Sequence, residues 1–148
     1  MALILIAEDD ELIVEAVRSA LGARGHIVGA VDNGMPVASI VEFKRPALVI
    51  LDCNMPDLPG IEALRQIRLL RTAHATPVLM LTARCGAFDE EIAMRAGASD
   101  YLRKPFDSDQ LVSRVETLLR RAELQERPLP APPMYHAPPP QNRAWGQR

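Results

Sequence analysis

The chain has 148 residues, of which 48% are hydrophobic and 24% charged, with a formal net charge of −2. This length suits one domain, or one domain with a tail, and the composition excludes a wholly disordered or collagen-like chain. No apolar run approaches the roughly 20 residues of a membrane span, and no basic residue precedes the apolar N-terminal stretch as in a secretory signal. We therefore expect a cytoplasmic protein with no membrane partner. The charge balance also provides no overall basic field for nucleic-acid binding.

The two cysteines, Cys53 and Cys85, are too few for a disulfide framework or a zinc site of their own. Their scarcity fits a reducing compartment. We expect both to pack as small apolar side chains.

Five short apolar runs alternate along the chain with amphipathic segments. The runs cover residues 3–7, 26–31, 47–51, 77–81 and 99–103. Three of them are almost continuously apolar, which is typical of parallel strands covered on both faces. Between the runs, apolar residues recur at the three- and four-residue spacing of helices, last from Asp107 to about Leu124. The alternation predicts an α/β three-layer sandwich, a parallel sheet with helices on both faces.

Turn and capping residues agree with these boundaries. Residues 33–36 combine a turn with a proline suited to a first helical turn, and Gly97 follows a predicted helix. Asp107 or Ser108 can cap the last helix.

The C-terminal part has a different composition. Seven of the thirteen prolines fall between Pro128 and Pro140, without the apolar periodicity that would bury a face. Such a sequence favours extended polyproline II. We expect a domain over residues 1–123 and a disordered, proline-rich tail over 124–148, in which residues 134–136 or Trp145 are candidates for a contact peptide.

Polar residues follow four of the predicted strands. They are Glu8, Asp9 and Asp10 after the first strand, Asp52 after the third, Thr82 after the fourth and Lys104 after the fifth. In open parallel sheets, ligands bind beyond the carboxyl ends of the strands, so these groups should meet at one edge.

The chemistry of these groups points to phosphoryl transfer. Three acids close together repel one another, and a divalent cation relieves that repulsion. Mg²⁺ prefers such hard oxygen ligands. Lys104 adds a compact positive charge and Thr82 a hydroxyl. These are the parts that let the Asp52 carboxylate attack phosphorus and hold the resulting phosphoryl group.

The sequence resembles the receiver domains of bacterial two-component response regulators. The likeness covers residues 2 to about 122 and rests on four spaced motifs, at residues 5–10 (LIAEDD), 51–60 (LDCNMPDLPG), 81–83 (LTA) and 100–106 (DYLRKPF). It implies a flavodoxin-like fold with a five-stranded parallel sheet. It also implies a phosphorylation-dependent signalling switch that assists its own phosphorylation and dephosphorylation, rather than an enzyme with turnover.

The resemblance assigns a phosphoacceptor and a metal site. Asp52 would accept the phosphoryl group. Asp9 would bind Mg²⁺ directly and Glu8 through water, with Asp52 itself and the backbone carbonyl of Asn54 completing the protein ligands. From the sequence, Asp10 could exchange roles with Asp9.

The resemblance also assigns a switch. Lys104 would pair with the phosphoryl group, through a segment whose Lys104–Pro105 bond is cis. Thr82 would move to bond the phosphoryl group, and Tyr101, a strand residue with its ring toward the core, would follow inward. We further expect Asn54 and Arg84, each two residues beyond a site residue, to tune the phosphoryl lifetime.

The implied partners are proteins. A sensor histidine kinase or a histidine phosphotransfer protein would donate the phosphoryl group, with Mg²⁺-dependent autodephosphorylation afterwards. A downstream protein would read the surface of the fourth helix, fifth strand and fifth helix. Direct contact with nucleic acid is not expected.

A phosphorylation-dependent homodimer is a further expectation. The last helix is similar to that of receivers in winged-helix transcription factors, which dimerise through salt bridges between subunits. Glu90 and Gln110 depart from that pattern, and Ser99 replaces an acid opposite Arg114. We therefore expect only Asp100 with Arg121 to remain as such a pair.

Three alternatives differ in class. The first is the input domain cut from a DNA-binding transcriptional regulator, which a gene continuing past Arg148 would support. The second is a phosphatase with an aspartate nucleophile, but Asn54 stands where a second acid is usual. The third is a flavin-binding electron carrier. The acids after the first strand would repel the phosphate of a flavin, and the sequence lacks a glycine- or hydroxyl-rich phosphate loop, so both features argue against this alternative.

Overall fold

The computed structural model describes residues 1–83 and 87–126. Arg84, Cys85 and the tail candidates at 134–136 and Trp145 lie outside the described residues. The strands are β1 (Leu3–Ala7), β2 (Ile27–Val31), β3 (Leu48–Asp52), β4 (Val78–Thr82) and β5 (Asp100–Arg103). The helices are α1 (Glu11–Gly22), α2 (Val37–Lys44), α3 (Gly60–Arg68), α4 (Ala87–Ala96) and α5 (Ser108–Glu126). None of these helices is both long and apolar enough to cross a membrane.

The five strands form one parallel sheet in the order β2-β1-β3-β4-β5. Each strand differs by at most one residue at either end from the apolar run that predicted it. The crossover from β1 through β2 and back to β3 places β1 and β3 side by side at the centre. The predicted flavodoxin-like fold is confirmed.

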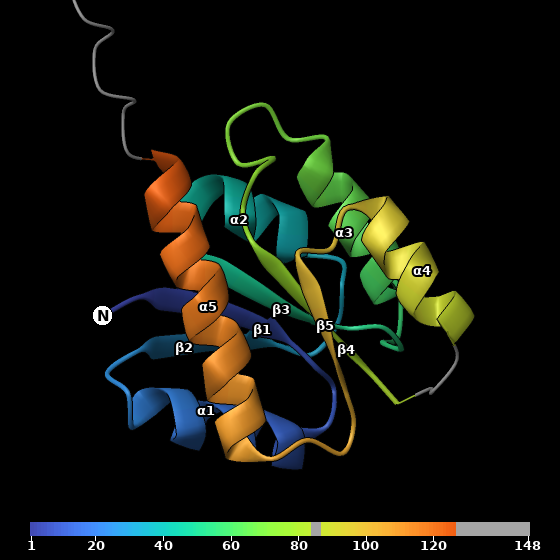
Figure 1. Cartoon of the computed structure of the whole chain (residues 1–148). Coiled ribbons are helices and arrows are strands. Elements are labelled where there is room, and N and C mark those ends of the chain that lie inside the picture. Colours follow the sequence, from blue (N-terminus) through green and yellow to red (C-terminus); the bar gives the residue numbers. More distant parts are fainter. Residues whose placement is uncertain (84–86, 127–148) are drawn as a thin grey trace, which may run out of the picture.

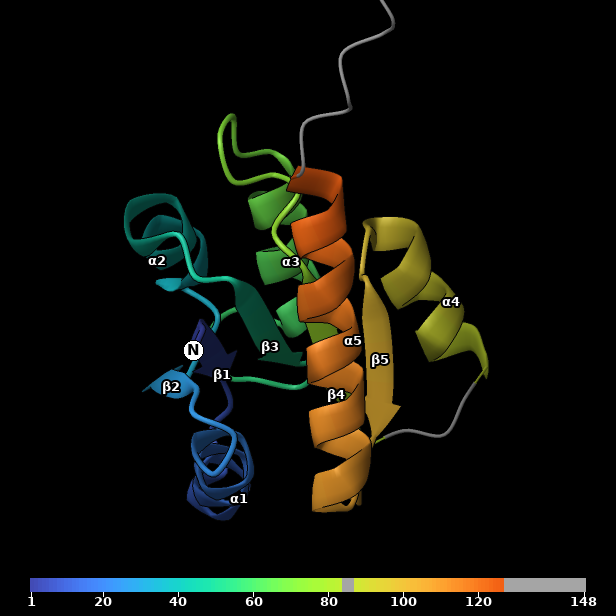
Figure 2. The ribbon, with the colours of Figure 1, turned by 60° about the vertical axis from the view of Figure 1, so that its left-hand side comes forward.

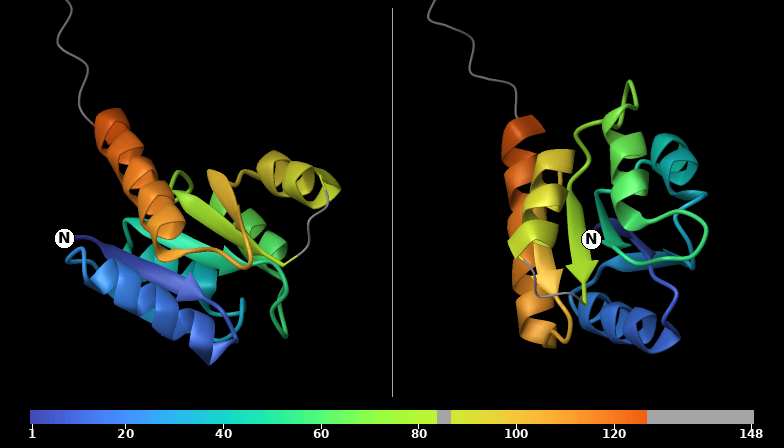
Figure 3. Two further views of the ribbon diagram at one scale, coloured as in Figure 1. Left: turned by 60° about the horizontal axis from the view of Figure 1, so that its bottom comes forward. Right: turned by 90° about the vertical axis from the view of Figure 1, so that its right-hand side faces the viewer.

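Helices cover both faces of the sheet (Figures 1 and 2). In Figure 1, α5 crosses the front of the sheet, whereas α2 and α3 lie behind it. One core joins α1 and α5 to the sheet, and the other joins α2, α3 and the end of α4 to it. All residues of β3 and β4 are buried, which explains why their sequences are apolar without alternation. Figure 3 shows the three layers from two further sides.

Side chains cap two of the helices at their N-termini. Asp10 caps α1, because its Oδ1 accepts from the Leu12 amide at 2.9 Å. Asp107 caps α5 through the Gln110 amide at 2.7 Å, and the Gln110 Oε1 accepts from the Asp107 amide at 3.3 Å. This reciprocal pair satisfies two donors that the helix itself leaves unbonded.

The helix C-termini follow the sequence signals less closely. Gly97, directly after α4, has the positive φ of +106° that favours glycine. Helix α5, however, continues to Glu126, two residues beyond the expected end at Leu124. The boundary at residue 124 therefore falls inside a helix, because helix ends are weakly encoded where no glycine or proline stops them.

A half-buried arginine ties two loops to the end of α3. The Arg68 Nε donates to the Gly97 carbonyl at 2.9 Å. Its Nη1 donates to the carbonyls of His74 and Thr76 at 2.9 and 2.7 Å. Burial lowers the pKa of Arg68. Arg68 thus fixes the segments that lead into β4 and β5. At the other end of these two strands, Thr82 is the last residue of β4 and Lys104 follows β5.

Candidate functional site

Three carboxylates meet where β1 and β3 end. Ala7 and Leu51 are register partners, so the residues that follow them, Glu8 and Asp52, emerge next to each other. One carboxylate oxygen each of Glu8, Asp9 and Asp52 lie within 4.8 Å of one another. Glu8 and Asp52 are each 3% exposed, whereas Asp9 is exposed. The strand ends therefore build a small acidic cluster with one side open to solvent.

Lys104 provides the positive charge of this cluster. Its Nζ lies 2.8 Å from the Glu8 Oε2 and 3.3 Å from the Asp52 Oδ1. The Lys104 amide also donates to the Thr82 carbonyl at 2.7 Å, which holds the end of β5 beside β4. The Lys104–Pro105 peptide bond is cis. The ammonium thus bridges two buried carboxylates that would otherwise repel each other.

Burial and mutual contact shift the pKa values of both Glu8 and Lys104. Burial raises the pKa of Glu8, the charge of Asp52 adds to this, and the hydrogen bonds from Lys104 and the Asp10 amide oppose it. For Lys104, burial alone would lower the pKa. The hydrogen bond to Glu8 and the charges of Asp52 and Glu8 outweigh that effect, so the pKa of Lys104 is raised and the ammonium stays charged.

The position of Asp10 settles which acids form the cluster. Asp10 caps α1 through its side chain, and its amide donates to the Glu8 Oε1 at 3.2 Å. Asp9, and not Asp10, contributes the third carboxylate. The structure thus distinguishes two neighbouring acids that the sequence left interchangeable.

Two other expected site residues lie beside Asp52. The Asn54 amide donates to the Asp52 Oδ1 at 3.3 Å. Thr82 ends β4, the strand next to β3, and is 4% exposed. Both residues therefore border the acidic cluster. Arg84 lies outside the described residues.

Gly60 is a site-supporting residue that the sequence analysis did not single out. Its amide donates to the Cys53 carbonyl at 3.2 Å. A Cβ at Gly60 would lie 2.1 Å from the backbone oxygen of Asp52. The first residue of α3 thus touches the strand end that carries Asp52. The available signal was a glycine as the first residue of a predicted helix, although glycine is a poor helix former.

Tyr101 lies farther out than expected. The ring is only partly buried against the core beneath α3 and α4. Its hydroxyl accepts from the Arg103 Nε at 3.2 Å, and the Arg103 guanidinium lies 5.9 Å from the ring centroid. The hydrogen bond to Glu90 and burial raise the pKa of Tyr101, with Arg103 opposing.

Arg114 has an acidic partner within the chain. The Arg114 Nη1 lies 2.9 and 3.0 Å from the two carboxylate oxygens of Asp100. Ser99 instead accepts from the Val78 amide through its Oγ at 3.0 Å. Asp100, which we expected to pair with Arg121 between subunits, is thus already paired with Arg114 inside one chain.

The fold and site define a class of protein. A parallel sheet in this order, with an acidic cluster and an opposed lysine at its carboxyl edge, is a doubly wound α/β domain with a polar site beyond its strand ends. The family model of the response regulator receiver domain matches residues 4–116. The chain therefore belongs to the receiver domains of two-component response regulators.

Individual relatives agree with this assignment. The response regulator MprA of Mycobacterium sp. (strain KMS) is 38% identical over 125 residues, which are 84% of this chain and 54% of that protein. The chain thus spans about half the length of the curated relatives it matches.

Solved structures show the same domain. The receiver domain of the Francisella response regulator 1452 has a TM-score of 0.75 at 27% identity and covers 82% of this chain and 98% of its own. The receiver domain of the sensor histidine kinase PA1611 from Pseudomonas aeruginosa has a TM-score of 0.75 at 29% identity, covering 80% and 98%. That structure holds a magnesium ion coordinated in the active site cleft.

Proposed function

We propose that Asp52 accepts a phosphoryl group from a phosphohistidine of a sensor histidine kinase or a histidine phosphotransfer protein. The observation that supports this most directly is the Lys104 ammonium, which lies within 3.3 Å of the Asp52 carboxylate inside an acidic cluster. Asp52 is also almost fully buried, so its charge is poorly screened by water and strongly affected by these neighbours.

The donor set suits Mg²⁺. Three carboxylates and one ammonium leave an excess of negative charge that a divalent ion balances, and oxygen donors are the ligands Mg²⁺ prefers. Asp9, Asp52 and the Asn54 carbonyl would hold the ion directly, and Glu8 through water. The magnesium ion in the Pseudomonas receiver supports this assignment. When bound, the ion would neutralise charge on the transferring phosphoryl group.

The proposed reaction has two steps. In the first, a carboxylate oxygen of Asp52 forms a bond to phosphorus while the bond from phosphorus to the donor's imidazole nitrogen breaks. Lys104 pairs with a phosphoryl oxygen as negative charge shifts there. In the second, water attacks phosphorus and the Asp52 carboxylate leaves, releasing phosphate. The domain would thus assist its own dephosphorylation, and Asn54 and Arg84, each two residues beyond a site residue in the sequence, would tune that rate.

Phosphorylation would change a surface as well as a site. Thr82 would move toward the phosphoryl oxygens, and Tyr101, now held at the surface by Arg103, would turn inward. This would alter the face of α4, β5 and α5, which a downstream protein or a second phosphorylated copy would recognise. The chain would act in the cytoplasm, where the donor kinases present their phosphohistidine.

Phosphorylation by acetyl phosphate with Mg²⁺, followed by intact mass measurement, tests the proposal. We expect one phosphoryl group on the wild-type chain and none on the Asp52→Asn variant. Asp57→Asn is the matched control, because Asp57 is an exposed acid of the same loop whose φ of 66° asparagine also adopts. A phosphoryl group on Asp52→Asn, or none on the wild type, would overturn the proposal.

A second candidate is the input domain of a longer, DNA-binding regulator. The observation that favours it is the 54% coverage of the MprA relative, which is about twice as long as the shared domain. Sequencing the gene past the codon for Arg148 tests it, since an in-frame DNA-binding domain is required.

A further inference from the structure

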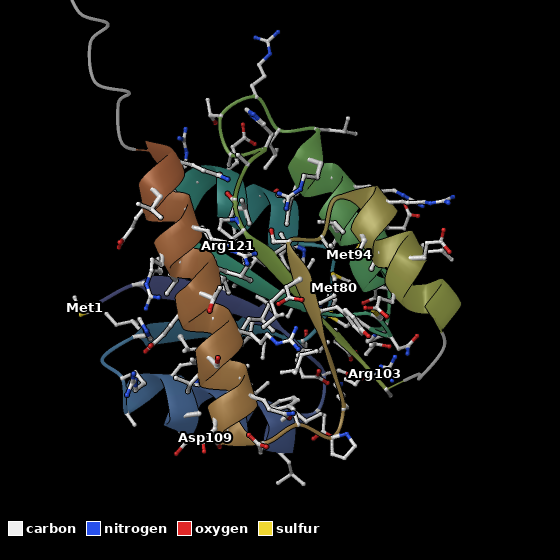
Figure 4. All side chains as sticks on the ribbon, viewed as in Figure 1. Met1, Met80, Met94, Arg103, Asp109 and Arg121 are labelled. Atoms are coloured by element: carbon white, nitrogen blue, oxygen red, sulfur yellow. The ribbon has the colours of Figure 1, made fainter. Side chains whose placement is uncertain are left out.

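A large cavity lies at the edge of the sheet opposite the acidic cluster. Its volume is about 770 Å³, within the size range of ligand and peptide sites. The residues preceding β1, β3 and β4 line it, together with the last turns of α5. Figure 4 labels Met1 at this edge and Arg103 at the acidic edge, on opposite sides of the ribbon. The cavity is therefore separate from the site of the proposed function.

The cavity continues into a second one along the sheet. The second cavity has a volume of about 260 Å³ and lies between β1, β2 and α2. Leu3 and Pro46 line both cavities. The two cavities are therefore neighbours, and we treat them together as one elongated depression, which a single extended chain segment could follow.

The walls offer apolar contacts. Met1 and Leu3 are 96% and 39% exposed. Ala75, Pro77 and Ala122 add further small apolar side chains. Apolar surface of this kind gains free energy when another chain segment covers it, in proportion to the area buried.

A buried ring nitrogen without a partner in the described part of the chain lies beneath the wall of the cavity. His26 lines the cavity, and its Nδ1 accepts from the Ala2 amide at 3.2 Å. In the neutral ring the Nε2 then carries the proton. This buried Nε2 has no hydrogen-bond partner among the described residues. The exposed apolar side chains of the walls favour an apolar, uncharged occupant.

The chain itself supplies such a segment at the rim. Leu119, Ala122, Glu123 and Gln125 of α5 line the cavity, and α5 ends one residue later at Glu126. Residues 128–142 contain no Asp, Glu, Lys or Arg, and five of residues 128–135 are proline or alanine. Proline offers a carbonyl without an N–H, and its fixed φ reduces the entropy lost on docking.

We propose that residues 128–135 of the same chain dock in this depression, with Leu129, Met134 and Tyr135 as the apolar anchors. At about 3.1 Å per residue in polyproline II, eight residues reach about 25 Å from the point where the tail leaves α5. The tail then covers the edge of the sheet opposite Asp52, and this site is independent of phosphorylation chemistry.

Backbone ¹⁵N relaxation of the full-length chain tests the docking directly. We expect amide order parameters of about 0.85 at Leu129, Ala131, Met134 and Tyr135, and values below about 0.6 at Ala144 and Trp145. Values below about 0.6 throughout residues 129–135 would overturn the proposal.

Two variants of the full chain locate the contact. Replacing Leu129, Met134 and Tyr135 together with serine should shift the amide signals of Ala2, Leu3 and Thr76. Ala144→Ser with Trp145→Ser is the matched control and should leave those signals in place. Conversely, Ala122→Trp fills the cavity and should lower the order parameters of residues 129–135 while the remaining domain signals persist.

Dilution distinguishes the chain's own tail from that of a second copy. Docking within one chain predicts amide shifts at Ala2 and Leu3 that do not change over a hundredfold dilution. Shifts that move with concentration toward those of the triple serine variant would assign the occupant to a second copy and contradict the proposal.

Discussion

The Lys104 ammonium lies closer to Glu8 than to Asp52, at 2.8 Å against 3.3 Å. Glu8 therefore holds the lysine at the site, and Asp52, the proposed phosphoacceptor, has the longer contact with it. Phosphorylation of Asp52 would place new oxygens near the same ammonium, so Lys104 needs only to strengthen an interaction that already exists.

Lys104→Ala should slow phosphorylation by acetyl phosphate by about 10²- to 10³-fold, the range seen when a preorganised group that stabilises transition-state charge is removed. The reason is the loss of the ammonium beside Asp52. Stopped-flow or timed mass measurement at saturating Mg²⁺ gives the rate. Lys44→Ala, which removes the chain's other lysine at the exposed end of α2, is the control and should leave the rate unchanged. Equal rates for wild type and Lys104→Ala would contradict the assigned role.

Asp9→Asn should weaken Mg²⁺ binding at least tenfold, because it removes one charge from the carboxylate cluster. Isothermal titration of Mg²⁺ into the chain measures the affinity. Asp10→Asn is a matched control in the adjacent position: asparagine caps α1 as well as aspartate does, and Asp10 is not a member of the cluster. A larger loss of affinity for Asp10→Asn than for Asp9→Asn would show that the metal ligands are assigned wrongly.

Gly60→Ala should lower the free energy of unfolding by about 1–3 kcal/mol, because its Cβ would lie 2.1 Å from the Asp52 carbonyl oxygen and force the backbone apart. Urea denaturation measures this. It should also reduce Mg²⁺ affinity, since the shifted strand end carries Asp52. At Gly22 a Cβ would meet nothing within 4 Å, so Gly22→Ala should be neutral or stabilising. Similar stabilities for the two variants would refute the close contact.

Arg68→Ala should lower the free energy of unfolding by about 3 kcal/mol, because it leaves partly buried carbonyls of two loops without their donor. Thermal or urea unfolding measures the change. Arg71→Ala, at an exposed position three residues later, should stay within about 0.5 kcal/mol of wild type. The role of Arg68 is contradicted if both substitutions have the same small effect.

Sequence patterns predicted the sheet well because β3 and β4 are buried on both faces, which leaves continuous apolar runs of the right length. The polar residues directly after those runs then had to meet at one edge. Asp52 and Lys104 are 52 positions apart in sequence, yet strand order alone brings them to 3.3 Å.

Side-chain geometry could not be predicted in the same way. Whether Asp9 or Asp10 turns toward the cluster depends on which of them caps α1. Likewise, the pairing of Arg114 with Asp100 depends on how far a flexible arginine extends from α5. The contact between Gly60 and Asp52 arises from the entry angle of α3, which no local pattern encodes.

Helix α5 begins just after the segment that carries Lys104 and ends at the wall of the opposite cavity. Its 19 residues form a rod about 28 Å long, because each residue adds 1.5 Å along the axis. Leu111, Val115 and Leu118 pack the first eleven residues of this rod against the sheet. One continuous helix therefore borders both the segment that carries Lys104 and the cavity at the other edge of the sheet, so the two edges share a single structural element.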